Sequence, residues 1–410
     1  MTASAARFLD ALQRVNGGTR GPFGLAVSGG GDSMAMLHLA VASGLQVSAV
    51  TVDHGLRPEA ADEAAFVGRV CAGLGVSHLV LAWRWNGRGN LQDAARRGRR
   101  RLIGDWARRA GLAAVMLAHS RDDVAETFLM RLARGAGVDG LSEMAGRWSE
   151  GGMTWLRPLL GHSRAALRDY LRGIGADWVE DASNSNLRFD RVKARKAITA
   201  LSPLGLTAER LSEVAGHLAE ARDALEAQAD LAAGAVLRGR DGVAFIDPAA
   251  LARQPADIGR RLVLRVLDWV VPADYAPRGA SVVGLVARIA AGKAATLAGC
   301  RFLPFQGGIA AFRELKAVQG CVAAPDALWD NRWQVTGAPL AAEVRALGAG
   351  IALCPRWREA GLPRAALMAG PALWQGERLV AAPLAGLGGR DVSFIPLPDA
   401  TALHHSRFLH

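Results

Sequence analysis

Residues 23–33, FGLAVSGGGDS, decide the fold of the N-terminal part of this 410-residue chain. The apolar run Phe23–Val27 predicts a buried strand of a parallel sheet, and Met34–Ala42 predicts a helix with an apolar face. Glycines between a strand and a helix let the backbone approach an anion, and the free N–H groups of the first helical turn point at it. The loop has no Walker lysine and continues instead with Asp32 and Ser33. The stretch therefore predicts a phosphate site, with a tight turn that holds no ligand as the alternative.

Strands and helices alternate after this loop, up to about Arg157. Further strands are expected at Gln46–Asp53, Ser77–Ala82 and Ala113–Ala118, and helices at Glu59–Leu74, Leu91–Ala110 and Asp122–Ala133. This alternation predicts an α/β fold with a doubly wound parallel sheet. Ligands of such sheets bind at the carboxyl ends of the strands, so Ser28, Asp53 and His119 should face one crevice.

A second motif, LAHSRDDVAET at residues 117–127, follows the strand at 113–118. His119 leaves the strand, and Asp122, Asp123 and Glu126 fall in the first turns of the next helix. Carboxylates in a first turn often only cap the helix or interact with its dipole. At the mouth of a nucleotide crevice they could also hold Mg²⁺ or accept a proton from an amine.

SGGGDS resembles the loop of the N-type ATP pyrophosphatases (the PP-loop superfamily), which cleave ATP between the α and β phosphates. The ordered motifs of roughly residues 20–200 are similar to those of the tRNA(Ile)-lysidine synthetase family. Besides the two stretches above, they are VDHGLR at 52–57, NLQDAARRGRRR at 90–101, RLARGAGVDGL at 131–141, RPLL at 157–160 and WVEDASNSNLRFDRVKAR at 178–195. The chain departs from the family pattern at Arg100, where a tyrosine is usual, and at Ser120–Arg121.

The resemblance implies a Rossmann-like PP-loop domain that uses ATP and Mg²⁺. It also implies the reaction: free L-lysine is joined to C2 of the wobble cytidine in the CAU anticodon of tRNA(Ile). The cytidine is first adenylated with release of pyrophosphate, and AMP leaves when lysine attacks.

The resemblance assigns site residues by position. The nucleotide-binding residues are Ser28, Gly29, Gly30, Gly31, Asp32 and Ser33. The catalytic residues are Asp32, His119, Asp122, Asp123, Glu126 and Arg96, with Asp32 and Asp122 as Mg²⁺ ligands, while His54 matches a histidine after the second strand. Which of the three carboxylates of the acidic helix accepts the proton from lysine stays open.

A net charge of +11 and a sequence pI near 10.5 favour a polyanionic partner such as RNA. A GC-rich genome, which favours arginine codons, is the simpler explanation of the arginine content. The arginines expected at the RNA are Arg97, Arg101, Arg131, Arg134, Arg191 and Arg195. A solvated basic face is the alternative for most of the arginines between 96 and 101, and a helix anchored in the core is the alternative for residues 189–195.

Composition and length predict the remaining organisation. We expect a catalytic domain at 1–200, a mainly helical middle domain at 201–325, and a small α+β domain at 326–410 that contacts tRNA. Helices are predicted at Thr207–Leu237, Ile258–Val271 and Ser281–Ala291. The four cysteines form no C-x-x-C pair, and no apolar run is long enough to span a bilayer, so a cytoplasmic protein without membrane contact is expected, as a monomer or a homodimer.

Three other functions fit parts of the sequence. A PP-loop tRNA thiolase would share the ATP loop, but such enzymes typically need paired cysteines. A non-catalytic RNA-binding protein with a relic nucleotide site would not need Asp32, His119, Asp122 and Glu126. An ATP-dependent ligase acting on a small metabolite would not need the basic charge or the C-terminal domains.

Overall fold

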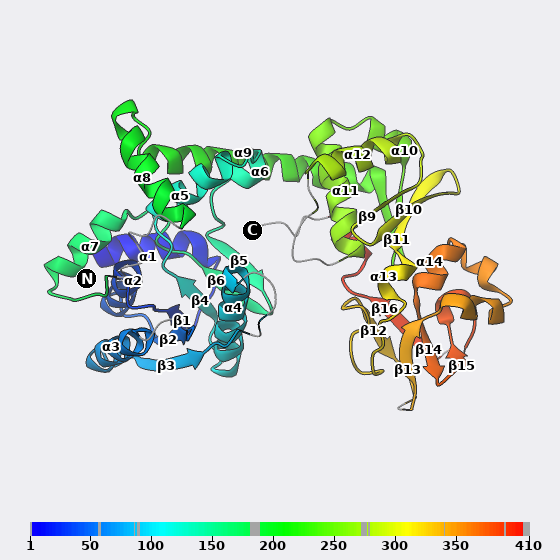
Figure 1. Cartoon of the computed structure of the whole chain (residues 1–410), viewed down its shortest axis with the longest axis horizontal. Helices are drawn as coiled ribbons and strands as arrows, with labels where there is room; N and C mark the ends of the chain where they lie inside the picture. Colours follow the sequence, from blue (N-terminus) through cyan, green and yellow to red (C-terminus); the bar gives the residue numbers. More distant parts are fainter. Residues whose placement is uncertain are drawn as a thin grey trace. The chain divides into compact units, whose positions relative to one another are not determined.

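The computed structural model separates the chain into two compact units, which divide within one long helix at Arg222 and Asp223 (Figure 1). The residues described are 2–55, 59–85, 87, 91–180, 189–271, 277, 279–339, 341–388 and 391–404, with only the backbone of Gln92. The predicted three-part division, with boundaries after residues 200 and 325, stays a prediction.

A six-stranded sheet with the order β3-β2-β1-β4-β6-β5 forms the first unit. Its strands are β1 (Phe23–Ala26), β2 (Val47–Asp53), β3 (Ser77–Ala82), β4 (Ala114–Leu117), β5 (Arg147–Glu150) and β6 (Met153–Leu156). All neighbours pair in parallel except β5 and β6, which form a hairpin. The predicted doubly wound sheet is confirmed. The hairpin was not predicted, although Gly151 and Gly152, both at positive φ, supply its turn.

The order of the strands places a topological switch point between β1 and β4. The chain runs outward from β1 through β2 to β3, and then returns to the other side of β1 for β4. The connections that leave β1 and β4 therefore diverge, which opens a crevice at their carboxyl ends. Residues 27–31 and 118–120 lie at these ends.

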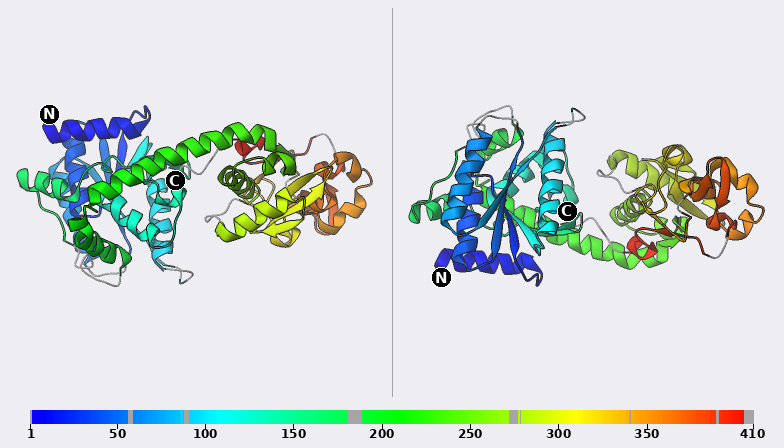
Figure 2. Two further views of the ribbon diagram at one scale, coloured as in Figure 1. Left: turned by 90° about the horizontal axis from the view of Figure 1, so that it is seen from above. Right: turned by 90° about the horizontal axis from the view of Figure 1, so that it is seen from below.

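Helices cover both faces of this sheet (Figure 2). The helices of this part of the chain are α1 (Ala3–Asn16), α2 (Gly31–Ala42), α3 (Ala60–Gly73), α4 (Leu91–Arg109), α5 (Arg121–Leu132), α6 (Val138–Leu141), α7 (Arg164–Gly173), α8 (Asp190–Leu201), the 3-10 turn η2 (Ser202–Leu204) and α9 (Ala208–Val236), whose second half belongs to the second unit. Because successive strand residues face opposite sides, Leu25 packs with α1, α2, α3 and α7, whereas Ala26 packs with Ile103 and Trp106 of α4. The predicted helices are confirmed to within a few residues. The one that follows the glycine loop begins at Gly31, three residues earlier than expected.

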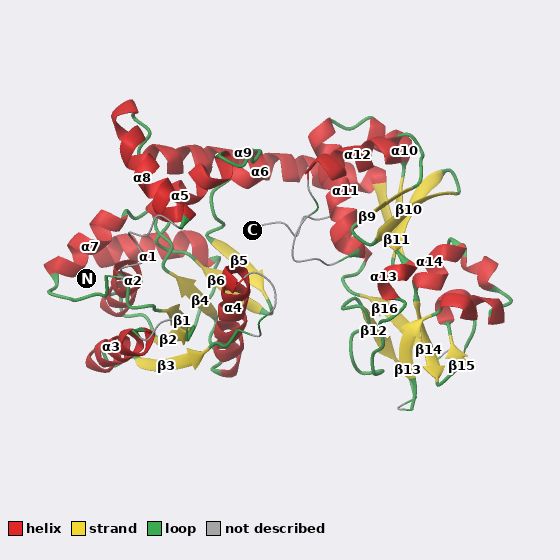
Figure 3. Ribbon diagram, viewed as in Figure 1, coloured by secondary structure: helices red, strands yellow, loops and turns green. Residues whose placement is uncertain are grey.

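The second unit begins with a five-stranded antiparallel sheet of order β7-β8-β11-β10-β9, covered by helices (Figure 3). Its elements are β7 (Leu237–Arg240), β8 (Val243–Ile246), α10 (Pro248–Ala252), α11 (Ala256–Val270), α12 (Gly279–Ala290), β9 (Ala295–Leu297), β10 (Cys300–Phe305) and β11 (Gly308–Arg313). The predicted helices are present, but the sheet was not predicted. Its strands have three to six residues, too few for a clear period, although Asp241–Gly242 is a hairpin signal.

The last part of the chain holds two smaller antiparallel sheets, β12–β16 and β13–β14–β15, which agrees with the predicted α+β composition. Its elements are α13 (Leu315–Val318), β12 (Trp333–Thr336), β13 (Glu343–Ala346), η3 (Gly348–Leu353), η4 (Trp357–Ala360), α14 (Arg364–Ala369), β14 (Pro371–Gln375), β15 (Arg378–Ala381), η5 (Pro383–Ala385), β16 (Ser393–Pro396) and η6 (Ala400–Leu403). Among the described residues, no helix is both long enough and apolar enough to cross a bilayer.

Candidate active site

The glycine loop is a tight turn that ends in the first turn of α2. Gly29 has φ +89°, and a Cβ there would lie 3.3 Å from Cγ2 of Val179, so the position requires glycine. The hydroxyl of Ser33 donates to the carbonyl oxygen of Gly30 at 2.8 Å and accepts the N–H of Ser28 at 3.2 Å. The N-terminus of α2 follows the carboxyl end of β1, and the N–H groups of a first helical turn can bind an anion there.

Ser120 joins this loop to the acidic helix α5. Its backbone N–H and its hydroxyl lie 2.9 and 3.1 Å from Oδ2 of Asp123, and the hydroxyl lies 3.3 Å from Oδ2 of Asp32. Ser120 is fully buried. The sequence identified this position only as a departure from the family pattern, yet it holds the two predicted acidic residues at one place.

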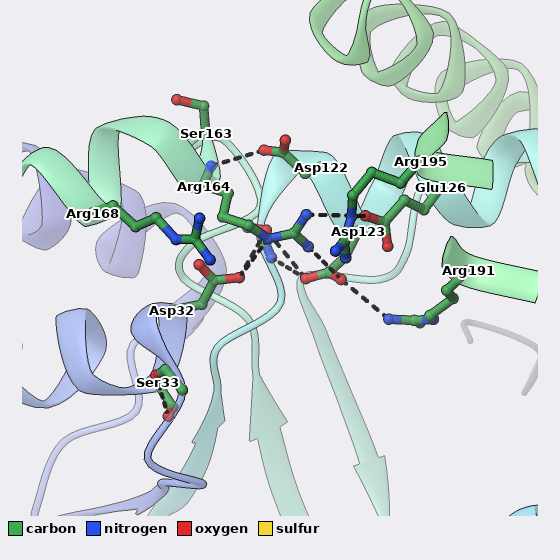
Figure 4. Close-up of polar contacts among 12 residues, drawn as sticks. Asp32, Ser33, Asp122, Asp123, Glu126, Ser163, Arg164, Arg168, Arg191 and Arg195 are labelled. Atoms are coloured by element: carbon green, nitrogen blue, oxygen red, sulfur yellow. Dashed lines mark hydrogen bonds and ion pairs between the residues drawn. The ribbon is translucent and has the colours of Figure 1, made fainter. Parts of the chain in front are cut away.

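Arg164, the first residue of α7, lies at the centre of the carboxylates (Figure 4). Its guanidinium donates to Oε1 of Glu126 at 3.0 Å, to Oδ1 of Asp123 at 3.3 Å and to Oδ2 of Asp32 at 3.4 Å. Its backbone N–H donates to Oδ2 of Asp122 at 2.8 Å. Asp122 therefore caps the N-terminus of α7 from another helix. Arg164 was not predicted from the sequence.

Two arginines of α8 reach the same carboxylates from the other side. Arg191 donates to Oδ1 of Asp123 at 3.1 Å, and Arg195 donates to Oε1 of Glu126 at 2.9 Å. Both were predicted to bind RNA. Their side chains are 47% and 38% exposed, so each contacts the site with one part and reaches solvent with another. Residues 181–188 of the motif at 178–195 lie outside the described residues, as do residues 56 and 57 of the motif at 52–57 and Asn90 of the motif at 90–101.

Two buried carboxylate oxygens of the cluster have no hydrogen-bond partner among the described residues, namely Oδ1 of Asp32 and Oε2 of Glu126. Glu126 is only 1% exposed, so water cannot easily satisfy its free oxygen. Buried acceptors of this kind cost free energy unless a ligand supplies the donor or the cation. The two oxygens therefore mark places for positively charged groups.

The electrostatics of the cluster follow from these contacts. Burial raises the pKa of the Asp32 carboxyl, although the Arg164 charge opposes the rise. Burial also acts to raise the pKa of Asp123, but the hydrogen bond from Ser120 and the guanidinium groups outweigh it and the pKa falls below 3.8. For Arg164, burial is outweighed by Glu126 and Asp123, and its pKa rises above the usual value. Asp123 and Arg164 are thus charged at neutral pH.

His119 is held next to the cluster as a neutral ring. Nε of Arg157 donates to its Nδ1 at 3.2 Å, which leaves the ring proton on Nε2. Burial and the charge of Arg157 lower the pKa of His119 to about 3. Arg157 itself stacks on the Trp148 ring at 3.9 Å. Burial and the nearby charge of Arg96 lower the pKa of Arg157 to about 10.

The other predicted RNA-binding arginines lie away from the carboxylates. Arg97 and Arg101 line a cavity of about 810 Å³ between α4 and the β5–β6 hairpin. Arg131 donates to the carbonyl oxygen of Gly140 at 2.9 Å, and Arg134 pairs with Asp190 at 3.2 Å. His54 follows β2 and contacts the edge of the Trp83 ring.

No group of three histidine, cysteine, aspartate or glutamate side chains in the described part of the chain could hold a metal ion by itself. Mg²⁺ in nucleotide sites is usually bound by one or two carboxylates together with phosphate oxygens and water. The free Oδ1 of Asp32, beside the N-terminus of α2, suits such a mixed site. One oxygen of Asp122 already accepts the N–H of Arg164, which leaves this residue at most one oxygen for an ion.

Comparison with known proteins shows the family to which this chain is similar. Residues 2–201 match the PP-loop domain family. A tRNA(Ile)-lysidine synthase of Ruegeria pomeroyi is 47% identical over 371 residues, which cover 89% of this chain and 88% of that protein. Synthases of the same name from Zymomonas mobilis and Wolbachia pipientis are 40% and 35% identical, covering 68% and 76% of this chain and 84% and 76% of theirs. A solved U34-tRNA thiolase from Methanococcus maripaludis aligns with 53% of this chain and 78% of its own, at a TM-score of 0.44 and 15% identity.

Proposed function

Because the chain belongs to the tRNA(Ile)-lysidine synthase family, we propose that it joins L-lysine to the wobble cytidine of tRNA(Ile) at the expense of ATP. The substrate is the isoleucine tRNA with a CAU anticodon, and the product is lysidine. The observation that best supports this function is the meeting of the ATP loop with a buried carboxylate, Glu126, whose Oε2 has no partner among the described residues. An anion site and a cation site adjoin there, as the joining of a nucleotide-activated base to an amine requires.

The first step activates the cytidine. The N-terminus of α2 holds the β and γ phosphates of ATP, and the C2 carbonyl oxygen of the cytidine attacks the α phosphorus. A bond forms between this oxygen and the phosphorus, the bond from the α phosphorus to the bridging oxygen breaks, and pyrophosphate leaves. His119, neutral and with its proton on Nε2, can donate a hydrogen bond to an oxygen near this position but cannot act as a base at neutral pH.

Asp32 would hold a Mg²⁺ ion through Oδ1 together with phosphate oxygens, and Asp122 would be its second protein ligand. The bound ion would neutralise the negative charge that develops on the departing pyrophosphate. Arg164 and Ser120 keep Oδ2 of Asp32 in place, so that Oδ1 points away from them and stays available.

The second step adds lysine. Glu126 binds the ε-ammonium through Oε2 and takes a proton from it, since only the neutral amine is a nucleophile. The nitrogen then attacks C2, the bond from C2 to the oxygen that carries the adenylyl group breaks, and AMP leaves. Of the three carboxylates on α5, Glu126 fits this role best. Both oxygens of Asp123 already accept hydrogen bonds, and Asp122 caps α7.

The tRNA would contact the basic surfaces beside the site. Arg97 and Arg101 line one cavity, Arg131 lies in the last turn of α5 and Arg134 follows that helix, so all four can meet phosphates. Arg96 would contact the adenylated cytidine or its phosphate. Arg191 and Arg195, which reach solvent as well as the carboxylates, would lie where the anticodon enters. We place the reaction in the cytoplasm.

Incorporation of radiolabelled lysine into an isoleucine tRNA transcript with a CAU anticodon tests the proposal. Lysine should enter the RNA with equal amounts of AMP and pyrophosphate. Pyrophosphate release without lysine would favour another nucleophile, such as sulfur in a thiolase, and RNA-independent turnover would favour a small-molecule ligase. No release at all would favour a binding protein.

The variant Asp32→Ala tests the ATP loop within the same assay. It should lose at least about a hundredfold in AMP formation, because the phosphate site loses its metal ligand, while tRNA binding measured by filter retention stays unchanged. Normal AMP formation in this variant would contradict the assignment of the loop.

A further inference from the structure

Arg164 contacts more carboxylates than charge neutralisation of α5 requires. Asp123 and Glu126 each have a second guanidinium partner on α8, from Arg191 and Arg195. Arg164 adds one more cation to both and also reaches Asp32 in the ATP loop, with its side chain only 17% exposed. A single, largely buried side chain thus connects the loop at the N-terminus of α2 with the acidic face of α5.

The position of Arg164 opposes the binding of an amine. An ammonium ion at the free Oε2 of Glu126 would share one carboxylate with Arg164 and Arg195, which both occupy Oε1. Like charges this close in a buried site repel each other strongly. The site therefore favours an amine only after at least one of these two guanidinium groups moves away.

Of the two arginines, Arg164 is the one whose guanidinium would have the phosphate oxygens of ATP nearby as alternative acceptors. Its Nε is 3.4 Å from Asp32, which lies in the first turn of α2 where the phosphates would be held. A guanidinium fork matches phosphate oxygens bidentately, and ATP carries more negative charge than any one of the carboxylates. Arg164 sits at the first position of α7, so its side chain can change rotamer without disturbing the rest of that helix.

We propose that Arg164 is a positioning residue that couples the ATP subsite to the amine subsite, so that ATP binds before lysine. Without ATP, its guanidinium holds Asp123 and Glu126. When the phosphates bind, it turns to them and leaves these two carboxylates to the ammonium ion. The inference rests on the proposed function, because it takes lysine and ATP as the substrates.

Calorimetry with the full-length protein tests the coupling. L-lysine is titrated with and without α,β-methylene ATP and Mg²⁺, which bind without cleavage. In the wild type the analogue should raise lysine affinity about tenfold or more. In Arg164→Met, lysine should bind without the analogue about as tightly as it binds the wild type with it. The coupling should shrink to about twofold or less, and the analogue itself should bind about tenfold more weakly.

Two further variants complete the test. Arg164→Lys keeps the charge but not the fork and should retain part of the coupling. Arg172→Met, an exposed arginine of the same helix that pairs with Asp169, should behave as the wild type. Thermal unfolding establishes whether each variant is folded. If Arg164→Met does not fold, the two wild-type titrations still test the coupling.

Equal lysine affinity with and without the analogue in the wild type would overturn the inference and leave the proposed function intact. Full coupling in Arg164→Met would also overturn it, since the ligands would then attract each other directly. Absence of lysine binding in every condition, with normal binding of the analogue, would overturn the proposed function together with the inference.

Discussion

Two glutamates, Glu126 in the first unit and Glu226 in the second, are largely buried and each pairs with two arginines, but they differ in how many of their carboxylate oxygens have a partner. Glu226 uses both: Oε1 accepts from Arg261, and Oε2 accepts from Arg265 at 2.7 Å. Glu126 receives both of its arginines on Oε1, and its Oε2 has no partner among the described residues. Its side chain is also the more buried, at 2% exposure against 14%.

The difference separates a structural ion pair from a binding site. Around Glu226 each buried charge is met by the protein itself, as folding requires of buried ionic groups. Around Glu126 the protein leaves one acceptor open at a place where water has little access, which is unfavourable unless a ligand fills it. Whether each carboxylate oxygen has a hydrogen-bond partner therefore distinguishes a binding site from a structural ion pair better than the number of neighbouring arginines does.

The largest effect is expected from Glu126→Gln. The amide cannot accept a proton and attracts the ammonium ion weakly, so lysine incorporation should fall by roughly 10²- to 10⁴-fold. Pyrophosphate release should fall much less, because the first step does not need this carboxylate. Single-turnover measurements of both products check the expectation. Equal losses in both steps would remove the distinction between Glu126 and a structural residue.

Glu226→Gln should lower the stability of the protein and leave lysine incorporation nearly unchanged. Arg261 keeps Asp257 and Arg265 keeps Asp230 as ion-pair partners, so the loss of the Glu226 charge is expected to cost about 1–3 kcal/mol in free energy of unfolding. Urea unfolding of the second unit measures the loss, and lysine incorporation per folded molecule should change by less than about twofold. Glu126→Gln should lose less stability than this, since Arg195 reaches water and Arg164 keeps Asp32 and Asp123. A stable Glu226→Gln protein would contradict the structural role.

The pH profile offers a finer comparison. Burial and Arg157 lower the pKa of His119 from 6.5 to about 3, so no histidine inflection is expected in kcat/KM from about pH 5 to about pH 8. The neutral form is favoured by folding, so this contribution to stability is complete above pH 6.5 and lost as the pH falls toward 3. In Arg157→Met the pKa should rise and an acid limb should appear. A histidine inflection already present in the wild type would contradict the assignment.

The smallest effect is expected from Arg101→Ala. This arginine lines the cavity beside α4 and lies outside the carboxylate cluster. Loss of one phosphate contact should weaken tRNA binding several-fold and lower the slope of log affinity against log salt by about one. Lysine binding in the presence of the ATP analogue should not change. An unchanged salt slope would show that the cavity does not meet RNA.

Much of the first unit could be predicted from sequence, because strand and helix periods alternate clearly there and the motifs fall at strand ends. Asp32, Asp123 and Glu126 all contact the guanidinium of Arg164, and their catalytic roles stay a prediction. The missed residue is Arg164. Ser163 accepts the N–H of Ala166 as a helix cap, so the start of α7 could be found, but the direction of one arginine depends on the packing of α7 against α2.

The arginines of α8 show a second limit. Their spacing indicated a basic helix, and the sequence assigned Arg191 and Arg195 to RNA. Which face of α8 meets the carboxylates depends on its packing against α5 and α9, where Ile198 and Leu211 join the apolar cluster of Val124 and Phe128. No local pattern carries that information. The RNA role of the two arginines stays a prediction.

A crystal structure with L-lysine, α,β-methylene ATP and Mg²⁺ would test the central claim most directly. We expect the lysine Nζ within hydrogen-bonding distance of Oε2 of Glu126, at about 2.6–3.2 Å, and both oxygens of Glu226 paired as before. A lysine whose ammonium lies elsewhere, with Oε2 of Glu126 still unpartnered, would contradict the claim that this open oxygen marks the amine site.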